Sequence, residues 1–319
     1  SVRNQPFRFY INDNSPSNDV YCTAVGDNLN SGLTNSAPMA DLNALLAKYS
    51  LAGGDTVYID TGTYRPLNVW RIGQSASAGW LGDPPVVFQG STNSFPSGTV
   101  LDRGYGIGGM EVAYAVGVEL RNITVSRTLG SAVSIKDSVG ITAEWLTVES
   151  GDVAFQMVGG ERLRVSHGMA YDCNRGVSVG AAGLGIFNPV KPIIENTVLW
   201  KMSETCIEAG AFQPVLRNNI LSVMPGKYVY DISTTNAIDS DYNSIWLGDG
   251  GRMFRRTLPP NQAPVPIIYE TVAKWAAVSG QDLHSYDGDP LLANPDLRNF
   301  RLMSQAGRWV PELGIWTND

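Results

Sequence analysis

The side chains that could bind or cleave a substrate recur along one part of the sequence. The candidate catalytic residues are Glu208, Tyr230, Lys136, Arg175 and Asp172. The candidate substrate-binding residues are Gln156, Ser178, Tyr228, Lys227 and Glu204. Carboxylates, amides and hydroxyls bind sugar hydroxyls, and the faces of tyrosine rings stack on sugar C–H groups. Together these residue types predict a surface that binds carbohydrate.

One reaction that this set could perform is β-elimination. A lyase must neutralise a uronate carboxylate and remove the proton from the adjacent ring carbon. The cation could be Lys136, Arg175 or Lys227, and the base could be Tyr230 or one of the basic residues. The set therefore contains both kinds of group that a lyase requires.

Glycoside hydrolysis is the second reaction, and it needs two carboxyl groups, about 5 Å apart for retention of configuration or farther apart for inversion. Glu208 could supply one group, and Asp172, Glu204 or Asp231 could supply the other. Asp231 is the weakest of these because it shares an inward register with Ile135. The alternative for every candidate is an ordinary solvated side chain, which is the commonest state of exposed polar residues.

A repeat in the chain would bring these residues together. The apolar-alternating segment at Val118 returns at intervals of 23, 22, 29, 22 and 22 residues, and the copies begin at Ile141, Leu163, Pro192, Pro214 and Asn236. A second track has intervals of 22, 22, 30 and 22 residues and contains Val133, Phe155, Val177, Ile207 and Val229. The Gly-rich segment 180–191 explains the longer interval as a loop insertion. Two tracks with one period indicate a repeating coil.

The pattern inside each repeat predicts a parallel β-helix. Apolar residues alternate at every second position in short bursts, which is typical of strands and not of helices. A coil of about 22 residues accommodates three short strands, and successive coils stack about 4.8 Å apart. If the second track points inward, the residues that follow its members point outward, and these are Ser134, Gln156, Ser178, Glu208 and Tyr230.

The bends and the N-terminal end of the coil can also be placed. Three asparagines follow strands at one shared register, where this residue type suits a left-handed bend and its amides could form a ladder; they are Asn122, Asn196 and Asn218. A helix that begins at Ser36 as N-cap and ends by Gly53 is expected to cover the first coil. Its apolar face would contain Leu42, Leu45, Leu46 and Tyr49.

The expected organisation is one structural domain with three parts. Residues 1–54 form an N-terminal strand, loop and capping helix, residues 55–247 form a β-helix of about eight or nine coils, and residues 248–319 form a closing segment. The chain has 43% hydrophobic and 17% charged residues, which is ample material for a buried core.

Charge and hydropathy also limit the classes of partner that the chain is expected to bind. The formal net charge is −7 without a basic run, which argues against nucleic acid. No apolar run approaches the length of about 18 residues that spans a bilayer, and the first residues lack the apolar core of a signal peptide. The sequence leaves the oligomeric state open.

No cofactor is expected. The histidines His167 and His284 lie far apart and have no other ligand types at metal spacing. GDNLNSG at 26–32 resembles a calcium loop in its alternating oxygens, but a structural turn is the preferred interpretation. The cysteines are best interpreted as small buried thiols, with a Cys173–Cys206 bridge as the open alternative.

Motifs near both ends resemble those of one protein superfamily. FYINDNS (9–15), GDNLNSGL (26–33) and GDTVYIDTGTY (54–64) are similar to the beginning of right-handed parallel β-helix domains of the pectin-lyase-like superfamily. DYNSIW (241–246), VAKWAAVSGQDLHS (272–285), DPLL (289–292) and FRLMSQAGRW (300–309) are similar to the closing segments of its secreted bacterial members. The resemblance implies an all-β fold, a single-stranded right-handed parallel β-helix solenoid with an N-terminal helical cap.

The resemblance also implies a function class. Membership implies a secreted or cell-surface module that acts on an extracellular glycan, as a polysaccharide lyase or a glycoside hydrolase. The alternative is a non-catalytic glycan-binding, adhesive or structural module of a larger surface protein, because the superfamily includes such proteins. The calcium-carboxylate cluster and catalytic arginine of pectate lyases have no clear counterpart here, nor does the catalytic motif of alginate epimerases. The absence of these motifs favours the non-catalytic module. The frequent activity of superfamily members on polysaccharide favours an enzyme.

Overall fold

The structure is a computed structural model of the chain. It describes residues 5–93, 98–180, 191–210, 213–233, 237–248, 250–256 and 267–303, and the backbone of 308–310 and 315–317. Most of the predicted loop insertion at 180–191 lies outside the described residues.

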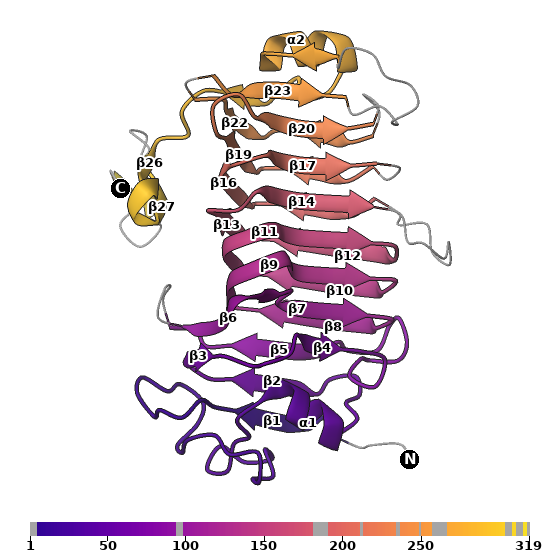
Figure 1. Ribbon diagram of the computed structural model, residues 1–319, viewed down its shortest axis with the longest axis vertical. Coiled ribbons are helices and arrows are strands. Elements are labelled where there is room, and N and C mark those ends of the chain that lie inside the picture. The colour runs from indigo at the N-terminus through magenta and orange to yellow at the C-terminus, as the bar shows by residue number, and fades with distance from the viewer. Residues whose placement is uncertain are drawn as a thin grey trace.

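One parallel sheet runs along the length of the molecule (Figure 1). Within the described residues its nine strands stack in the order β1 (Arg8–Ile11), β2 (Thr56–Ile59), β5 (Val86–Gly90), β8 (Val116–Arg121), β10 (Val139–Glu144), β12 (Glu161–Ser166), β15 (Ile193–Glu195), β18 (Val215–Arg217) and β21 (Asp239–Asp241). Ile141 pairs with Val118 on one side and with Leu163 on the other. This pairing confirms the predicted register of the first track at these coils.

A second sheet closes the coil and has two halves separated by a bend. Strands of its first half are β3 (Gly62–Tyr64), β6 (Thr99–Ile107), β13 (Met169–Tyr171), β16 (Val198–Met202), β19 (Ile220–Val223), β22 (Ser244–Trp246) and β25 (Tyr286–Asp287). Strands of its second half are β4 (Trp70–Ile72), β7 (Met110–Ala113), β14 (Arg175–Gly180), β17 (Thr205–Ala209), β20 (Tyr228–Ile232) and β23 (Arg252–Arg255). The long strands β9 (Ile123–Lys136) and β11 (Thr147–Val158) continue through the bend and belong to both halves.

The second predicted track forms an inward column over four coils. Val133 pairs with Phe155, Phe155 with Val177, and Val177 with Ile207. All four side chains are fully buried in one continuous hydrophobic core. Burial of a side chain of this kind contributes about 1.5–3 kcal/mol, so the column is a main source of stability. These pairings confirm the track as far as Ile207, whose partner on the next coil is Tyr230 and not the predicted Val229.

The last interval of the first track is longer than predicted. Leu216 pairs with Ser240, so the interval is 24 residues and not 22. One residue is added before Tyr230, which pairs with Ile207, and another is added between Ile232 and Ser240. The alternation survives the error because a shift of two residues keeps the same side of the strand inward.

The left-handed bends occur where they were predicted. Asn122, Asn196 and Asn218 have φ angles of +54°, +50° and +56°. The predicted amide ladder is one residue later in the chain, where the Nδ2 atom of Asn219 donates to Oδ1 of Asn243 over 3.0 Å. Both of these later side chains are buried, so the ladder satisfies polar groups inside the coil.

Helix α1 (Leu42–Lys48) lies near the N-terminal end of the stack (Figure 1). It is shorter than predicted, because its N-cap is Asp41 and not Ser36. The preceding Met39 pairs with Ile11 as an extended bridge, which keeps that stretch out of the helix. Leu42 and other apolar residues of α1 join the core, whereas its role as a cover of the first coil stays a prediction.

The C-terminal segment packs on the other end and on one side of the stack. Helix α2 (Val272–Ser279) buries Trp275 against Phe254, with 4.8 Å between ring centroids, and strand β24 (Ile268–Tyr269) pairs with β23. Strands β26 (Leu292–Asn294) and β27 (Asn299–Leu302), joined by the 3-10 turn η2 (Pro295–Leu297), form a hairpin whose Phe300 contacts Tyr171. Strands β28 (Arg308–Val310) and β29 (Ile315–Thr317) pair with each other in antiparallel orientation.

The three cysteines are unbonded and buried, which confirms the preferred interpretation of Cys22, Cys173 and Cys206. Burial raises the pKa of the Cys173 thiol to about 12. The described helices are too short or too polar for a membrane span.

Candidate functional site

A row of polar side chains lies on the outer side of the second half of the second sheet. Direct pairing between coils gives the order Glu111, Ser134, Gln156, Ser178, Glu208, Asp231 and Arg255. Neighbouring coils are about 4.8 Å apart, so side chains on adjacent rungs can contact each other. Four members of this row, from Ser134 to Glu208, were predicted to face outward, and their registers are confirmed.

Tyr230 does not belong to this row, and its predicted outward position is wrong. It pairs with Ile207 and is fully buried in the core. Its hydroxyl lies 2.8 Å from Oγ of Ser240 and 3.1 Å from Oδ2 of Asp282. Burial, together with the nearby Asp282 charge, raises the pKa of the phenol well above its ordinary value. A side chain in this position cannot reach a ligand on the outer surface.

A longer turn explains the misplaced register. Met202 pairs with Val223, an interval of 21 residues, whereas Thr205 pairs with Tyr228, an interval of 23. The turn between them therefore has two extra residues, a net gain of one over the 22-residue interval at Leu199, and Gly226 adopts a φ of +75° within it. Asp231 consequently takes the outward position that had been given to Tyr230. The Pro225-Gly226 dipeptide is a typical turn signal. It indicated a turn at this place, but the predicted register followed the repeat interval and left no room for a longer turn.

Arg175 is the centre of an ion network on this surface. Its Nη2 atom lies 3.0 Å from Oδ2 of Asp152, and its Nη1 atom lies 3.2 Å from Oε2 of Glu208. Its Nε atom lies 3.5 Å from Oε2 of Glu204. Burial alone would lower the pKa of Arg175, but Asp152 and Glu208 outweigh burial and raise it. The guanidinium of Arg175 therefore brings three carboxylates, those of Asp152, Glu204 and Glu208, close to one another.

Glu208 is oriented by two donors. The Oε2 atom that accepts from Arg175 also accepts from the Ser178 hydroxyl over 2.9 Å. Ser178 is the preceding rung of the row, so the pleat of the sheet places it beside Glu208. The predicted binding residue Ser178 therefore positions a predicted catalytic residue.

Arg175, Glu204 and Glu208 line one groove of about 350 Å³, here called the charged groove. Its lining residues are Arg175, Glu204, Thr205, Glu208, Gly226, Lys227, Tyr228, Asp231 and Arg255. Five of the ten predicted site residues are among them. The set contains three carboxylates and three cations, so it can bind hydroxyl groups and can also hold an acid–base pair.

The far wall of the charged groove was missed by the sequence analysis. Asp231 accepts a 3.0 Å hydrogen bond from Nε of Arg255, and that bond raises the pKa of Arg255. The same guanidinium lies over the Tyr228 ring, 4.9 Å from its centroid. Arg252 donates to the Tyr228 hydroxyl over 3.3 Å. Arg252 and Arg255 lie beyond residue 247, where the β-helix was expected to end, so no outward register was assigned to them.

The other predicted site residues lie elsewhere. Lys136 is near the other end of the row, with its Nζ atom 2.6 Å from Oε2 of Glu111. Asp172 is an exposed bend residue with φ of +54°, and it is not among the residues that line the charged groove. The Oε1 atom of Gln156 accepts from the Ser131 hydroxyl over 2.9 Å. Neither Lys136 nor Asp172 is therefore brought to Glu208.

The described residues offer no obvious place for a metal. No group of three or more His, Cys, Asp or Glu side chains in the described ranges could hold an ion. In the calcium-like segment, Oδ1 of Asn28 accepts from the backbone nitrogens of Ala40 and Asp41, both over 3.0 Å, and Oδ1 of Asp27 accepts from Leu29. These oxygens stabilise the local turns.

Comparison with known proteins bears on the fold. The sequence matches no protein-family model and no curated protein. The structure is similar to the crystal structure of pectate lyase Pel9A, with a TM-score of 0.54 and 14% identity over 76% of this chain and 63% of that one. It is also similar to a lacto-N-biosidase from Eubacterium ramulus, with a TM-score of 0.45 and 10% identity over 78% of this chain and 61% of that one. The chain thus spans less than two thirds of the length of either protein.

The stacked parallel sheets and the inward column of Val133, Phe155, Val177 and Ile207 agree with this similarity. At 14% identity the likeness to Pel9A concerns the fold alone. The chain therefore has a right-handed parallel β-helix fold, like that of pectate lyase Pel9A.

Proposed function

We propose that the chain is a secreted or cell-surface module that binds an extracellular polysaccharide in the charged groove and cleaves it by glycoside hydrolysis. The observation that carries the proposal is that Glu204, Glu208 and Asp231 line one groove from adjacent coils. Glycosidases generally use a pair of carboxyl groups that flank the scissile bond. Glu208 and Asp231 lie on neighbouring rungs, which in a β-sheet are about 4.8 Å apart, and Glu204 precedes the strand that contains Glu208.

Glu208 is the first member of the proposed pair. Its Oε2 atom is fixed by Arg175 and Ser178, and a fixed carboxylate is suited to act as a nucleophile or as a base toward water. The second member is Glu204, whose side chain is 55% exposed, or Asp231 on the next rung. The relative rates of E204Q and D231N distinguish these two residues.

Hydrolysis is favoured over elimination because the arginines of the charged groove are already paired. Arg175 and Arg255 contact carboxylates of the protein, and a uronate would have to compete with those carboxylates for them. Lys227 lines the groove without an ion pair among the described residues, and it carries the second candidate function, a polysaccharide lyase. The name of the similar pectate lyase agrees with that second candidate.

The test is a screen of neutral and acidic polysaccharides with two readouts. Hydrolysis releases reducing ends without an unsaturated product, whereas elimination also produces an ultraviolet-absorbing double bond. We expect reducing ends alone, and we expect Glu208→Gln to lower the rate by about 10²–10³-fold, as for loss of an acid–base group. The matched control is Glu195→Gln, because Glu195 pairs with Arg164 on the other sheet.

Two outcomes would replace this proposal. An unsaturated product whose formation is lost in Lys227→Met would establish elimination. Glycan binding that Glu208→Gln weakens, without any product from any polymer, would establish a non-catalytic binding module.

A further inference from the structure

A second groove lies on a different part of the coil, at the bends between the two sheets. It has a volume of about 320 Å³, and its lining includes Asn122, Trp145 and His167. No Asp, Glu, Lys or Arg is among its lining residues, which contribute hydroxyls, amides, an indole, an imidazole and a thioether. We call it the aromatic groove. It shares no lining residue with the charged groove, and the proposed hydrolysis does not use it.

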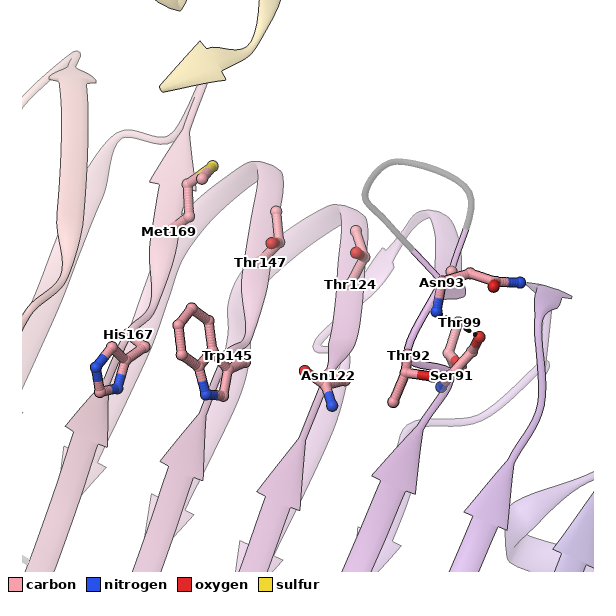
Figure 2. A pocket seen from close by; sticks show the side chains of 11 residues that line it. Ser91, Thr92, Asn93, Thr99, Asn122, Thr124, Trp145, Thr147, His167 and Met169 are labelled. Atoms are coloured by element: carbon pink, nitrogen blue, oxygen red, sulfur yellow. Dashed lines mark hydrogen bonds between the residues drawn. The ribbon is translucent and has the colours of Figure 1, made fainter. Parts of the chain in front are cut away.

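The bends place Asn122, Trp145 and His167 in one row across successive coils (Figure 2). All three have left-handed backbones, with φ of +54°, +56° and +51°. The Trp145 and His167 rings are stacked, with 4.4 Å between centroids and 17° between planes. His167 therefore covers one face of the indole and extends it into a two-ring stack.

The other face of the indole is directed toward the rung of Asn122, where the stack is interrupted. Asn122 is smaller than a ring, and the next rung of the row is Gly90, which has no side chain. Ser91 and Thr92 stand on the far side of Asn122 and close the space (Figure 2). Trp145 is 56% exposed although it has a stacking partner. The row thus contains an aromatic face and beside it a space that no protein ring fills.

The chemistry of this space selects its ligand. An indole face is electron-rich, and it attracts the weakly positive C–H groups on one side of a pyranose ring. Thr124 and Thr147 form a second row beside the aromatic one and offer hydroxyls to the ligand (Figure 2). The lining contains no Lys or Arg that would pair with a uronate or a sulfate. A volume of about 320 Å³ lies at the small end of ligand sites, which suits a short saccharide.

We infer that the aromatic groove is a binding site for a neutral saccharide, one of whose rings stacks on the face of Trp145 opposite His167 and fills the vacant rung over Asn122. The inference does not depend on the proposed hydrolysis. A chain that cleaves nothing would still bind a neutral sugar at this place.

The test is calorimetric titration with neutral hexasaccharides of glucose, xylose, mannose and galactose, and with hexagalacturonate as the acidic comparison. We expect at least one neutral hexasaccharide to bind and Trp145→Ala to weaken that binding at least about tenfold. The matched control is Trp80→Ala, because Trp80 is also an exposed tryptophan but lies outside the groove. The component of binding that Trp145→Ala removes should persist in Glu208→Gln, which separates this site from the charged groove.

A second variant fills the space and leaves the tryptophan in place. Asn122→Tyr adds a ring at a bend whose backbone matches that of Tyr242, with φ of +54° and +56°. We expect it to fold normally, as checked by thermal unfolding, and to lose neutral binding by at least about tenfold. The inference is overturned if no neutral hexasaccharide binds, if only hexagalacturonate binds, or if Trp145→Ala and Asn122→Tyr both bind like the unmodified chain.

Discussion

The charged groove and the aromatic groove occur in one solenoid but are made from different parts of its coil. Residues of strands and of the turns before them form the charged groove, where the long Arg175 side chain reaches Glu208 on the adjacent coil. Bend residues and the first residues of the strands that follow them form the aromatic groove, where Trp145 and His167 stack face to face. The charged surface satisfies most of its own groups, whereas the stack of Trp145 and His167 ends on an open indole face. The charged groove therefore holds its reactive groups in place, whereas the aromatic groove leaves one face of the Trp145 ring open to a ligand.

A filled counterpart of the open stack occurs farther along the same row of bends. Tyr242, with φ of +56°, stacks on His284 with 5.0 Å between centroids and 9° between planes. His284 belongs to the C-terminal segment and not to a bend of the coil. The row thus already accepts a ring brought from outside it, which is the arrangement inferred for a sugar at Trp145.

The largest effect that separates the two grooves is expected from Arg175→Met. Removal of the guanidinium leaves Asp152, Glu204 and Glu208 without their shared cation, so the carboxylates repel one another and lose their orientation. We expect hydrolysis to fall about 100-fold, comparable to the loss of one preorganised donor. Binding of a neutral hexasaccharide at Trp145 should not change.

The control for this prediction is Arg164→Met, which removes a similar ion pair with Glu195 from the first sheet. Initial rates of reducing-end release, measured beside calorimetric titration, give both readouts. If Arg175→Met and Arg164→Met lose the same fraction of the hydrolysis rate, the loss results from a general change in surface charge and not from the charged groove. Loss of hexasaccharide binding in Arg175→Met would show that the two grooves are coupled.

An intermediate effect is expected from Tyr230→Phe, and it concerns stability. The hydroxyl contacts Ser240 and Asp282 inside the core, so its removal leaves buried groups with one partner fewer. We expect the free energy of unfolding, measured in urea, to be about 1–2 kcal/mol lower than that of the unmodified chain. Hydrolysis and saccharide binding should remain unchanged because the side chain does not reach either groove.

Tyr228→Phe is the matched variant, because Tyr228 lines the charged groove two residues earlier. Its free energy of unfolding should stay within about 0.5 kcal/mol of that of the unmodified chain. The opposite pattern, with activity lost in Tyr230→Phe at full stability, would restore the outward position of Tyr230 and would contradict the pairing of Tyr230 with Ile207.

The Tyr230 error shows what the sequence could and could not predict. Periodicity placed Ser178 and Glu208 correctly, because stacking requires the same side of each strand to be apolar. It failed at Tyr230 because Val229 and Tyr230 are both fully buried, so apolar character alone does not choose between registers separated by one residue. The extra length of the turn at Gly226 decided the register.

The convergence on Arg175 was beyond the sequence for a different reason. Asp152 lies on one neighbouring coil of Arg175 and Glu204 and Glu208 lie on the other, and which of them a long arginine side chain contacts depends on its rotamer. The open face of Trp145 likewise depends on segment 91–93, which is not part of the repeat. Repeats predict columns and rows, whereas grooves also depend on the segments that interrupt the repeat.

The smallest effect is expected where the filled stack is held by an ion pair. The Nδ1 atom of His284 lies 2.7 Å from Oδ2 of Asp241, and the histidine side chain is 60% exposed. We expect Asp241→Asn to lower the free energy of unfolding by less than about 1 kcal/mol, as for other exposed pairs. Thermal unfolding of this variant and of Tyr242→Ala would show whether the pair or the ring contact contributes more.

The effect of Asp241→Asn should also depend on pH. Burial alone would raise the pKa of Asp241, but hydrogen bonds from His284 outweigh it and hold that pKa below its ordinary value. A carboxyl group with a lowered pKa in the folded state stabilises the fold above its unfolded pKa of about 3.9, and the contribution is lost as pH falls through the folded value. The unmodified chain and Asp241→Asn should therefore differ at neutral pH and become equal in strong acid. A difference that persists unchanged in acid would mean that Asp241 acts through packing and not through its charge, and the filled stack would then need no ion pair to hold it.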